Sequence, residues 1–399
     1  MTEKTNTPEL RFPEFREGWK EFILNDVSIK KSKKNKNNLY NETFTNSAEY
    51  GIVSQKEYFD KEISNKKNLN NYYIVEPNDF VYNPRISNLA PVGPINRNKL
   101  NRTGVMSPLY TVFSTKLSIK SFLEYYFKTS KWHRFMKLNG DSGARSDRFT
   151  IKQSLFIKMP IFLPSNQEQE KIGDFFSKLD RQIELEEQKL EKLEEQKKGY
   201  MQKLFSQELR FKTKDNVYYS EWQLHKLGEI FKYSQGQQIS VDKQFSVMNN
   251  GMKRFIRIVD ITENPEPRFV LYESDAGLVN KGDLFMIRYG RPGIVSIGFE
   301  GIIANNLFKL IPKIKISTIY FYYLLSYNYY RINLLTNQST MPALNFKSLD
   351  LLKFKIPSYK EQNKIANFLE SIDKLVIKQS DKVKLLKQRK KGLLQKMFV

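Results

Sequence analysis

The sequence predicts an α+β fold in which two mixed α/β modules alternate with two long helices in a pseudo-twofold repeat. Residues 164–180 (PSNQEQEKIGDFFSKLD) and 357–373 (PSYKEQNKIANFLESID) match in register, and each copy ends in a related motif, QKLF at 202–205 or QKMF at 395–398. A heptad pattern follows each copy, and short aromatic or β-branched runs fill the remainder. We therefore expect the first module over residues 1–163, the central helix over 164–206, the second module over 207–356 and the C-terminal helix over 357–399.

The two modules are expected to contain short strands that are separated by Gly, Pro and Asn. The leader motif ELRF occurs at 9–12 and again at 208–211, and a Trp follows each copy. One helix is expected in each module, over 121–138 and over 318–335. The expected strands lie near residues 73–75, 79–82 and 109–113 in the first module and near 255–259, 284–288 and 307–310 in the second.

Each long helix begins with a capping-box pattern. Ser165 and Glu168 have the spacing of an N-cap and its N3 partner, and Ser358 and Glu361 repeat it. Two boxes at equivalent places in a repeat predict two real helix starts.

Apolar residues recur at steps of four and three along both helices, which is typical of a coiled-coil seam. Polar residues interrupt the seam at Glu186 and Lys197 and, equivalently, at Gln379 and Lys390. The first helix carries 10 acidic and 8 basic residues over 167–205, whereas the second carries 4 and 11 over 358–398. Opposite net charges favour antiparallel pairing of the two helices, although the seam could instead face an external partner. The expected seam residues are Ile172, Phe176, Leu179, Ile183, Leu190, Leu193, Ile365, Leu369, Ile372, Val376, Val383 and Leu386.

Composition favours a polyanionic partner. The formal charge of the 399-residue chain is +23, and nucleic acid is the most common partner for such an excess. High lysine usage is also typical of AT-rich genomes. The chain has no Cys and only two His, which excludes thiol catalysis and disfavours metal clusters. With neither a signal-peptide core nor a membrane-length apolar run, a cytoplasmic protein is expected.

Catalytic motifs are scarce. The sequence contains neither a phosphate-binding GxxxxGK nor a GxGxxG. Residues 82–85 (YNPR) resemble the Asn-Pro-Pro-aromatic motif of amino-methyltransferases, but Arg85 and Ile86 replace its Pro and aromatic residue. We therefore expect neither a catalytic site nor a metal site in this chain.

Basic and amide side chains in polar loops are the candidates for DNA contact. A lysine run near residue 33 suits phosphates, while Arg beside Gly can reach a guanine edge, and Asn or Gln can reach adenine. The Gly-containing loops are 141–148 (DSGARSDR) and 288–293 (RYGRPG). The candidates are Lys31, Lys33, Lys34, Gln55, Arg85, Asn88, Arg145, Arg148, Gln237, Arg257, Arg288, Arg291 and Gln338.

Taken together, the two P-S-x-x-E-Q-x-K-I helix starts and the two QK(L/M)F ends resemble the specificity subunit of Type I restriction-modification enzymes. PELRFPEF at 8–15, SPLYTVF at 107–113 and KGDL at 281–284 also resemble that family. The resemblance implies two target-recognition domains that read a split site in double-stranded DNA, and helices that hold them apart and dock two methyltransferase subunits. It places S-adenosylmethionine, ATP and Mg in partner methyltransferase and restriction subunits, with no cofactor in this chain.

Two other classes of function fit the sequence less well. A free-standing DNA methyltransferase or nuclease is disfavoured because its motifs are missing. A structural coiled-coil adaptor would not need two large, diverged, basic modules.

Overall fold

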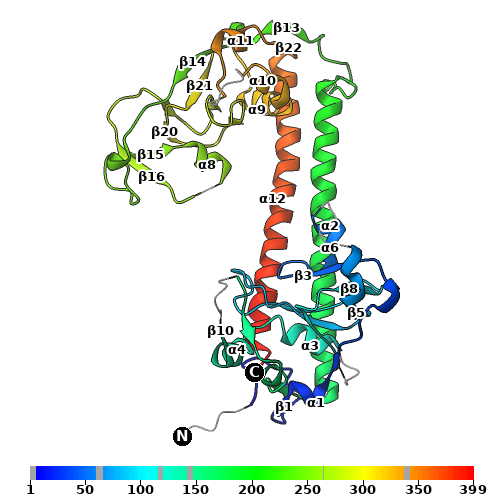
Figure 1. Ribbon diagram of the computed structural model, residues 1–399. Coiled ribbons are helices and arrows are strands. Elements are labelled where there is room, and N and C mark those ends of the chain that lie inside the picture. Colours follow the sequence, from blue (N-terminus) through cyan, green and yellow to red (C-terminus); the bar gives the residue numbers. More distant parts are fainter. Residues whose placement is uncertain (1–5, 60–65, 116–119, 142–146, 264, 337–341) are drawn as a thin grey trace. The chain divides into compact units, whose positions relative to one another are not determined.

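The computed structural model describes residues 6–59, 66–115, 120–141, 147–263, 265–336 and 342–399. The chain divides into two compact units: unit 1 consists of Met1–Glu187 and Asp381–Val399, and unit 2 consists of Gln188–Ser380. Each unit therefore combines one mixed α/β module with part of both long helices. These helices are α6 (Asn166–Phe205) and α12 (Tyr359–Lys396), green and orange to red in Figure 1.

Unit 1 contains a four-stranded antiparallel sheet in the order β2-β9-β6-β7. Its strands are β2 (Ser28–Lys31), β9 (Thr111–Thr115), β6 (Phe80–Tyr82) and β7 (Ile95–Arg97). Four strand pairs accompany it: β1 (Lys20–Ile23) with β12 (Pro160–Leu163), β3 (Phe44–Ser47) with β4 (Gly51–Ser54), β5 (Tyr73–Val75) with β8 (Gly104–Met106), and β10 (Gly140–Asp141) with β11 (Thr150–Ile151). Its shorter helices are α1 (Leu24–Val27), η1 (Lys36–Asn38), α2 (Gln55–Phe59), η2 (Lys66–Asn71), α3 (Lys120–Tyr126), α4 (His133–Asn139) and α5 (Gln153–Phe156).

Unit 2 repeats this framework with different residues. Its sheet β14-β21-β18-β19 corresponds to β2-β9-β6-β7, and its pair β13/β22 corresponds to β1/β12. A second sheet, β16-β15-β20-β17, contains a parallel pair, β15 with β20. The strands are β13 (Gln223–Lys226), β14 (Phe231–Gln235), β15 (Met252–Ile256), β16 (Arg268–Leu271), β17 (Leu278–Val279), β18 (Leu284–Ile287), β19 (Val295–Ser296), β20 (Gly301–Ile303), β21 (Leu307–Pro312) and β22 (Lys353–Ile356). The helices are α7 (Leu227–Ile230), η3 (Val241–Lys243), α8 (Ile258–Thr262), α9 (Thr318–Tyr327), α10 (Tyr329–Asn333) and α11 (Phe346–Asp350).

The helix starts lie where the capping patterns place them. The N–H of Glu168 donates to Ser165 Oγ (3.4 Å), and the N–H of Glu361 donates to Ser358 Oγ (3.5 Å). Both carboxylates are fully buried and bind an arginine of the repeated ELRF motif. Arg11 Nε donates to Glu168 (2.7 Å), and Arg210 Nη2 donates to Glu361 (3.0 Å). The leader and the helix start are thus repeated together because they bind each other.

Within each unit the two long helices run antiparallel. In unit 1, Lys382 of α12 binds Glu186 of α6 (2.5 Å). In unit 2, the rings of Tyr200 and Phe368 meet edge to face, with centroids 5.0 Å apart. All twelve expected seam residues are buried or half-buried. Seven of them pack in or against the hydrophobic cores of the units: Ile172, Phe176 and Leu179 in unit 1, and Ile365, Leu369, Ile372 and Val376 in unit 2.

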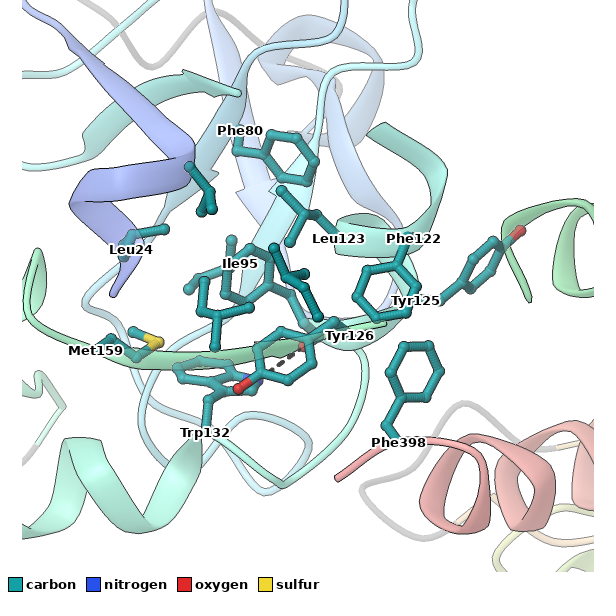
Figure 2. Packing of buried hydrophobic residues seen from close by; sticks show 14 of the residues in the cluster. Leu24, Phe80, Ile95, Phe122, Leu123, Tyr125, Tyr126, Trp132, Met159 and Phe398 are labelled. Carbon is teal, nitrogen blue, oxygen red and sulfur yellow. Dashed lines mark hydrogen bonds between the residues drawn. The ribbon is translucent and has the colours of Figure 1, made fainter. Parts of the chain in front are cut away.

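The hydrophobic core of unit 1 includes the chain segment that follows α12. Phe398 is fully buried and lies against Phe122 and Tyr126 of α3, with ring centroids 5.2 and 6.2 Å away (Figure 2). Nearby, the Leu10 N–H donates to the Lys396 carbonyl (2.9 Å). In unit 2, the Leu209 N–H donates to the Lys203 carbonyl (3.0 Å) at the equivalent place.

Three local expectations are wrong. The helix expected over 121–138 is two helices, α3 and α4, and that expected over 318–335 is α9 and α10. Side chains bond the preceding turns at both breaks: Thr129 Oγ1 donates to the Tyr126 carbonyl (2.7 Å), and Asn328 Nδ2 donates to the Leu324 carbonyl (2.8 Å). The strand expected over 255–259 ends at Ile256, and Val259 lies in α8.

Candidate nucleic-acid interface

Unit 1 contains a cleft of about 670 Å³ beside the β3–β4 hairpin. The end of β3, helix α2, residues 83–89 and residues 107–110 form its walls. Its lining combines amide, hydroxyl and guanidinium groups with aromatic and aliphatic side chains, the mixture that base edges and thymine methyl groups require. The lining includes Thr45, Asn46, Gln55, Tyr58, Phe59, Asn83, Arg85, Leu89, Leu109, Tyr110 and Arg148.

Asn46 organises the floor of this cleft. Its Nδ2 donates to the Val81 carbonyl (2.7 Å), and its Oδ1 accepts from Asn96 Nδ2 (2.7 Å). Its backbone carbonyl accepts from Asn83 Nδ2 (2.8 Å). These bonds fix strand β3 against β6 and β7, so the polar groups at the rim project from a rigid base.

Three of the expected DNA contacts, Gln55, Arg85 and Arg148, line this one cleft. Gln55 Nε2 donates weakly to the Phe44 carbonyl (3.4 Å), and among the described residues no partner reaches its buried Oε1. Arg85 is 67% exposed and lies 3.7 Å from Asp147 Oδ2. Asn88 is exposed on the same loop. The expected contact Arg145 lies outside the described residues.

Sequence reasoning missed the hairpin and helix that complete the cleft. Tyr58 and Phe59 on α2 pack edge to face, with centroids 4.7 Å apart, and Tyr50 packs on Tyr58 at 6.0 Å. All three rings are partly exposed. The sequence signal for this part of the cleft was the aromatic and amide content of residues 44–59. Only the β3–β4 pairing shows that these residues lie beside residues 83–89.

The lysine run lies elsewhere in unit 1, away from the lining of the cleft. Lys31 binds Glu76 and Asp79, the latter at 3.3 Å. Burial alone would lower the pKa of Lys31, but these carboxylates raise it. Burial also raises the pKa of Asp79. Lys33 and Lys34 expose their side chains to solvent, while their backbones pair with residues 73–74.

The expected contacts in unit 2 differ in accessibility. Arg257 donates to Asp260 (2.8 Å), and Arg288 donates to Gln235 Oε1 (2.8 Å) while lying over the Phe346 ring at 4.3 Å. These guanidinium groups are held by the protein itself.

The remaining expected contacts in unit 2 are Gln237, Arg291 and Gln338. The Gln237 N–H donates to the Ile303 carbonyl (2.8 Å), and its side chain is half-buried. Arg291 is exposed, whereas Gln338 lies outside the described residues.

The described residues contain no helix that is both long and apolar enough to cross a membrane. Nor do they place three His, Cys, Asp or Glu side chains together in an arrangement suited to a metal ion.

Comparison with known proteins assigns the chain to a family. The family described as "Type I restriction modification DNA specificity domain" matches residues 16–195 and 219–387. The chain belongs to this family and contains two copies of its domain.

Curated relatives and solved structures are consistent with this assignment. The MjaVIII specificity subunit of Methanocaldococcus jannaschii is 26% identical over 45% of this chain and 42% of its own length. The putative MjaX specificity subunit of the same organism is 27% identical over 68% of this chain and 65% of its own length. These matches therefore span less than two thirds of either relative.

Two solved structures share the fold. The type I S subunit from M. genitalium has a TM-score of 0.60 and 16% identity, covering 98% of this chain and 99% of its own. A chain from a study of type I assembly and conformational transition has a TM-score of 0.59 and 14% identity, covering 96% and 98%.

Proposed function

We propose that the chain is the non-catalytic subunit that gives a type I restriction-modification complex its DNA sequence specificity. Its modules at 1–163 and 207–356 read the two halves of a split site in double-stranded DNA, and the helical segments at 164–206 and 357–399 hold them apart. The observation that carries this proposal is the framework that the two units share, on which different side chains are displayed. A partner with two unlike half-sites needs this combination.

In unit 1, the cleft is the proposed reading surface. Arg85 projects into solvent at its rim, and Gln55 offers an amide that can bond an adenine edge. Tyr58 and Phe59 supply apolar surface for thymine methyl groups. Lys33 and Lys34 are proposed to contact phosphates, which position the protein without reading bases.

The helices are the proposed docking site for two methyltransferase subunits. Beyond the seam, they expose Leu185, Leu375, Ile377 and Leu385, which are between 49% and 65% accessible. Such residues are suited to an apolar partner surface. S-adenosylmethionine, ATP and Mg would then belong to the methyltransferase and restriction subunits, and the complex would act in the cytoplasm.

Mapping methylated sites in cells that express this chain with its partner subunits tests the proposal. The expected result is one split sequence with a fixed gap. Replacing Arg85 or Arg148 by Ala should weaken binding by about 1–3 kcal/mol and relax one half-site only. Arg134→Ala, an exposed change on α4, is the matched control. A methylated sequence that is unaffected by both cleft substitutions would mean that unit 1 reads DNA through another surface.

A further inference from the structure

The two lysines that interrupt the helical seam lie in equivalent polar clusters. Lys197 of α6 binds Asp373 of α12 (2.5 Å) in unit 2. Lys390 of α12 binds Asp180 of α6 in unit 1. All four side chains are between 19% and 27% exposed. The interruptions are therefore paired charges at the helix–helix contact.

A tyrosine from the neighbouring module completes each cluster. Tyr125 of α3 donates its hydroxyl hydrogen to Asp180 Oδ2 (2.9 Å), and Tyr323 of α9 donates to Asp373 Oδ2 (2.6 Å). The lysine ammonium lies over the ring of the same tyrosine, 5.7 Å from the centroid of Tyr125 or 5.5 Å from that of Tyr323. One aspartate thus joins three elements: the module helix and both long helices.

The cluster in unit 1 extends toward the cleft. Lys128 lies 3.9 Å from Asp180 and 3.2 Å from buried Glu124, which accepts from Arg97 Nε at 2.9 Å. Arg97 follows Asn96 on β7, and Asn96 bonds Asn46 in the floor of the cleft. Polar contacts therefore lead from the helix pair to β7, and the neighbouring residue on the opposite face of that strand, Asn96, bonds the floor of the proposed reading surface.

Such clusters contribute more to geometry than to stability. Removing charges from water costs free energy that their attraction only partly recovers, so apolar replacements are often neutral or stabilising. A directional hydrogen bond and a paired charge are nevertheless satisfied in only one arrangement of the module and the helices, as buried polar residues are in coiled coils. A cluster that is repeated in both units at the module–helix contact suits a geometric role.

We propose that Tyr125, Asp180 and Lys390 in unit 1, and Tyr323, Asp373 and Lys197 in unit 2, are positioning residues that fix each module on the helix pair. Resting on the proposed DNA-reading function, this assignment makes the clusters determinants of the gap length that the protein accepts. The apolar cores hold the parts together, while the clusters define their orientation.

Spin-label distance measurements on the full chain test the positioning role directly. The chain has no native cysteine, so Leu39→Cys on the module and Gln182→Cys on α6 give a unique label pair within unit 1. Tyr125→Phe, Asp180→Leu and Lys390→Met together remove both charges and the hydroxyl, so they should broaden the distance distribution while the melting temperature stays unchanged or rises. Tyr126→Phe is the matched control, because its hydroxyl donates to Pro160 within the module (3.2 Å).

Methylation mapping with the partner subunits provides the second measurement. The unit 1 variant with all three substitutions and Tyr323→Phe should each accept gaps one base pair shorter or longer than the wild-type gap. Tyr320→Phe is the control in unit 2, since no partner reaches its hydroxyl among the described residues.

The two measurements separate the possible failures. Distance and gap distributions that match wild type in the variants would overturn the positioning role. If the wild-type chain directs no split-site methylation, the proposed function fails, and the distance distributions still decide whether the clusters position the module.

Discussion

At the scale of single residues, the clearest feature is a buried carboxylate at the start of each long helix. Both Glu168 and Glu361 are fully buried and face an arginine from the preceding leader. The sequence predicted the helix starts, because a capping pattern is local. It could not predict the arginine partners, which lie more than 150 residues away along the chain.

Removing one of these arginines should strongly destabilise its own unit. We expect Arg11→Met to cost about 3–5 kcal/mol, because it leaves Glu168 charged and unpaired in the core. The double change Arg11→Met with Glu168→Gln should cost less. Urea unfolding, with a separate spectroscopic probe in each unit, provides the measurement. Arg181→Met, which breaks an exposed ion pair with Glu184, should cost under about 1 kcal/mol. Equal costs for Arg11 and Arg181 would contradict the prediction.

Glu124 gives unit 1 a pH-dependent contribution to stability. Burial would raise the pKa of Glu124, but Lys128, Arg97 and Lys99 lower it from 4.5 to about 2. Because the folded-state pKa lies below the unfolded one, the ionised carboxylate stabilises the fold above about pH 4.5. That contribution, about 3 kcal/mol, is lost as the pH falls toward 2.

Glu124→Gln should therefore lower the free energy of unfolding at pH 7 by roughly this 3 kcal/mol, and the difference from wild type should narrow at pH 3. Urea titrations at both pH values measure it. Glu170→Gln, on the exposed surface of α6, is the control. A difference that is the same at both pH values would show that the substitution acts through packing.

At the scale of elements, local patterns predicted the long helices but not the sheets. The heptad seam depends on neighbours three and four residues apart, and α6 and α12 extend over the segments that it indicates. Sheet order depends on pairings such as β2 with β9, between segments about 80 residues apart. The cleft depends on the same kind of long-range pairing. The sequence therefore predicted some of its residues individually but could not show that they lie together.

The chain segment that follows α12 should be essential to unit 1. Phe398→Ala should cost about 3–5 kcal/mol, because a fully buried ring leaves a cavity among Trp19, Phe122 and Phe176. Phe205→Ala in unit 2 should cost less, since Phe205 is only half-buried. Chemical denaturation of both variants gives the comparison, and a larger cost for Phe205 would refute this ranking.

At the scale of the whole molecule, the repeat predicted two similar frameworks, but the charge of +23 could not show which face of each module meets DNA. Unit 1 brings three of its expected contacts, Gln55, Arg85 and Arg148, to one cleft. In unit 2, Arg257 and Arg288 are held by contacts with other residues of the unit. Loop side chains acquire these roles only through tertiary contacts.

If the helices set the spacing between half-sites, their length should be readable in DNA. Inserting four residues between Glu187 and Gln188, where the two units meet in sequence, adds about 6 Å of helix. Four residues also preserve the seam as a tolerated stutter. At 3.4 Å per base pair, the unread gap should grow by about one or two base pairs while both half-sites stay the same. Methylation mapping measures the gap. An active variant with an unchanged gap would show that the helices do not set the spacing between the half-sites.

The backbone bond between Leu10 and Lys396 has a consequence for chain connectivity. In unit 2 the same bond joins Leu209 to Lys203 within continuous polypeptide. We therefore expect the fold to form whichever of these two junctions is covalent. A circularly permuted chain, opened between residues 206 and 207 and closed by a short flexible linker from residue 399 to residue 6, should reach the same melting temperature within a few degrees. It should also direct methylation of the same split sequence. The order of the two modules in the gene would then be interchangeable, while the order of the two half-sites in the DNA target stays fixed.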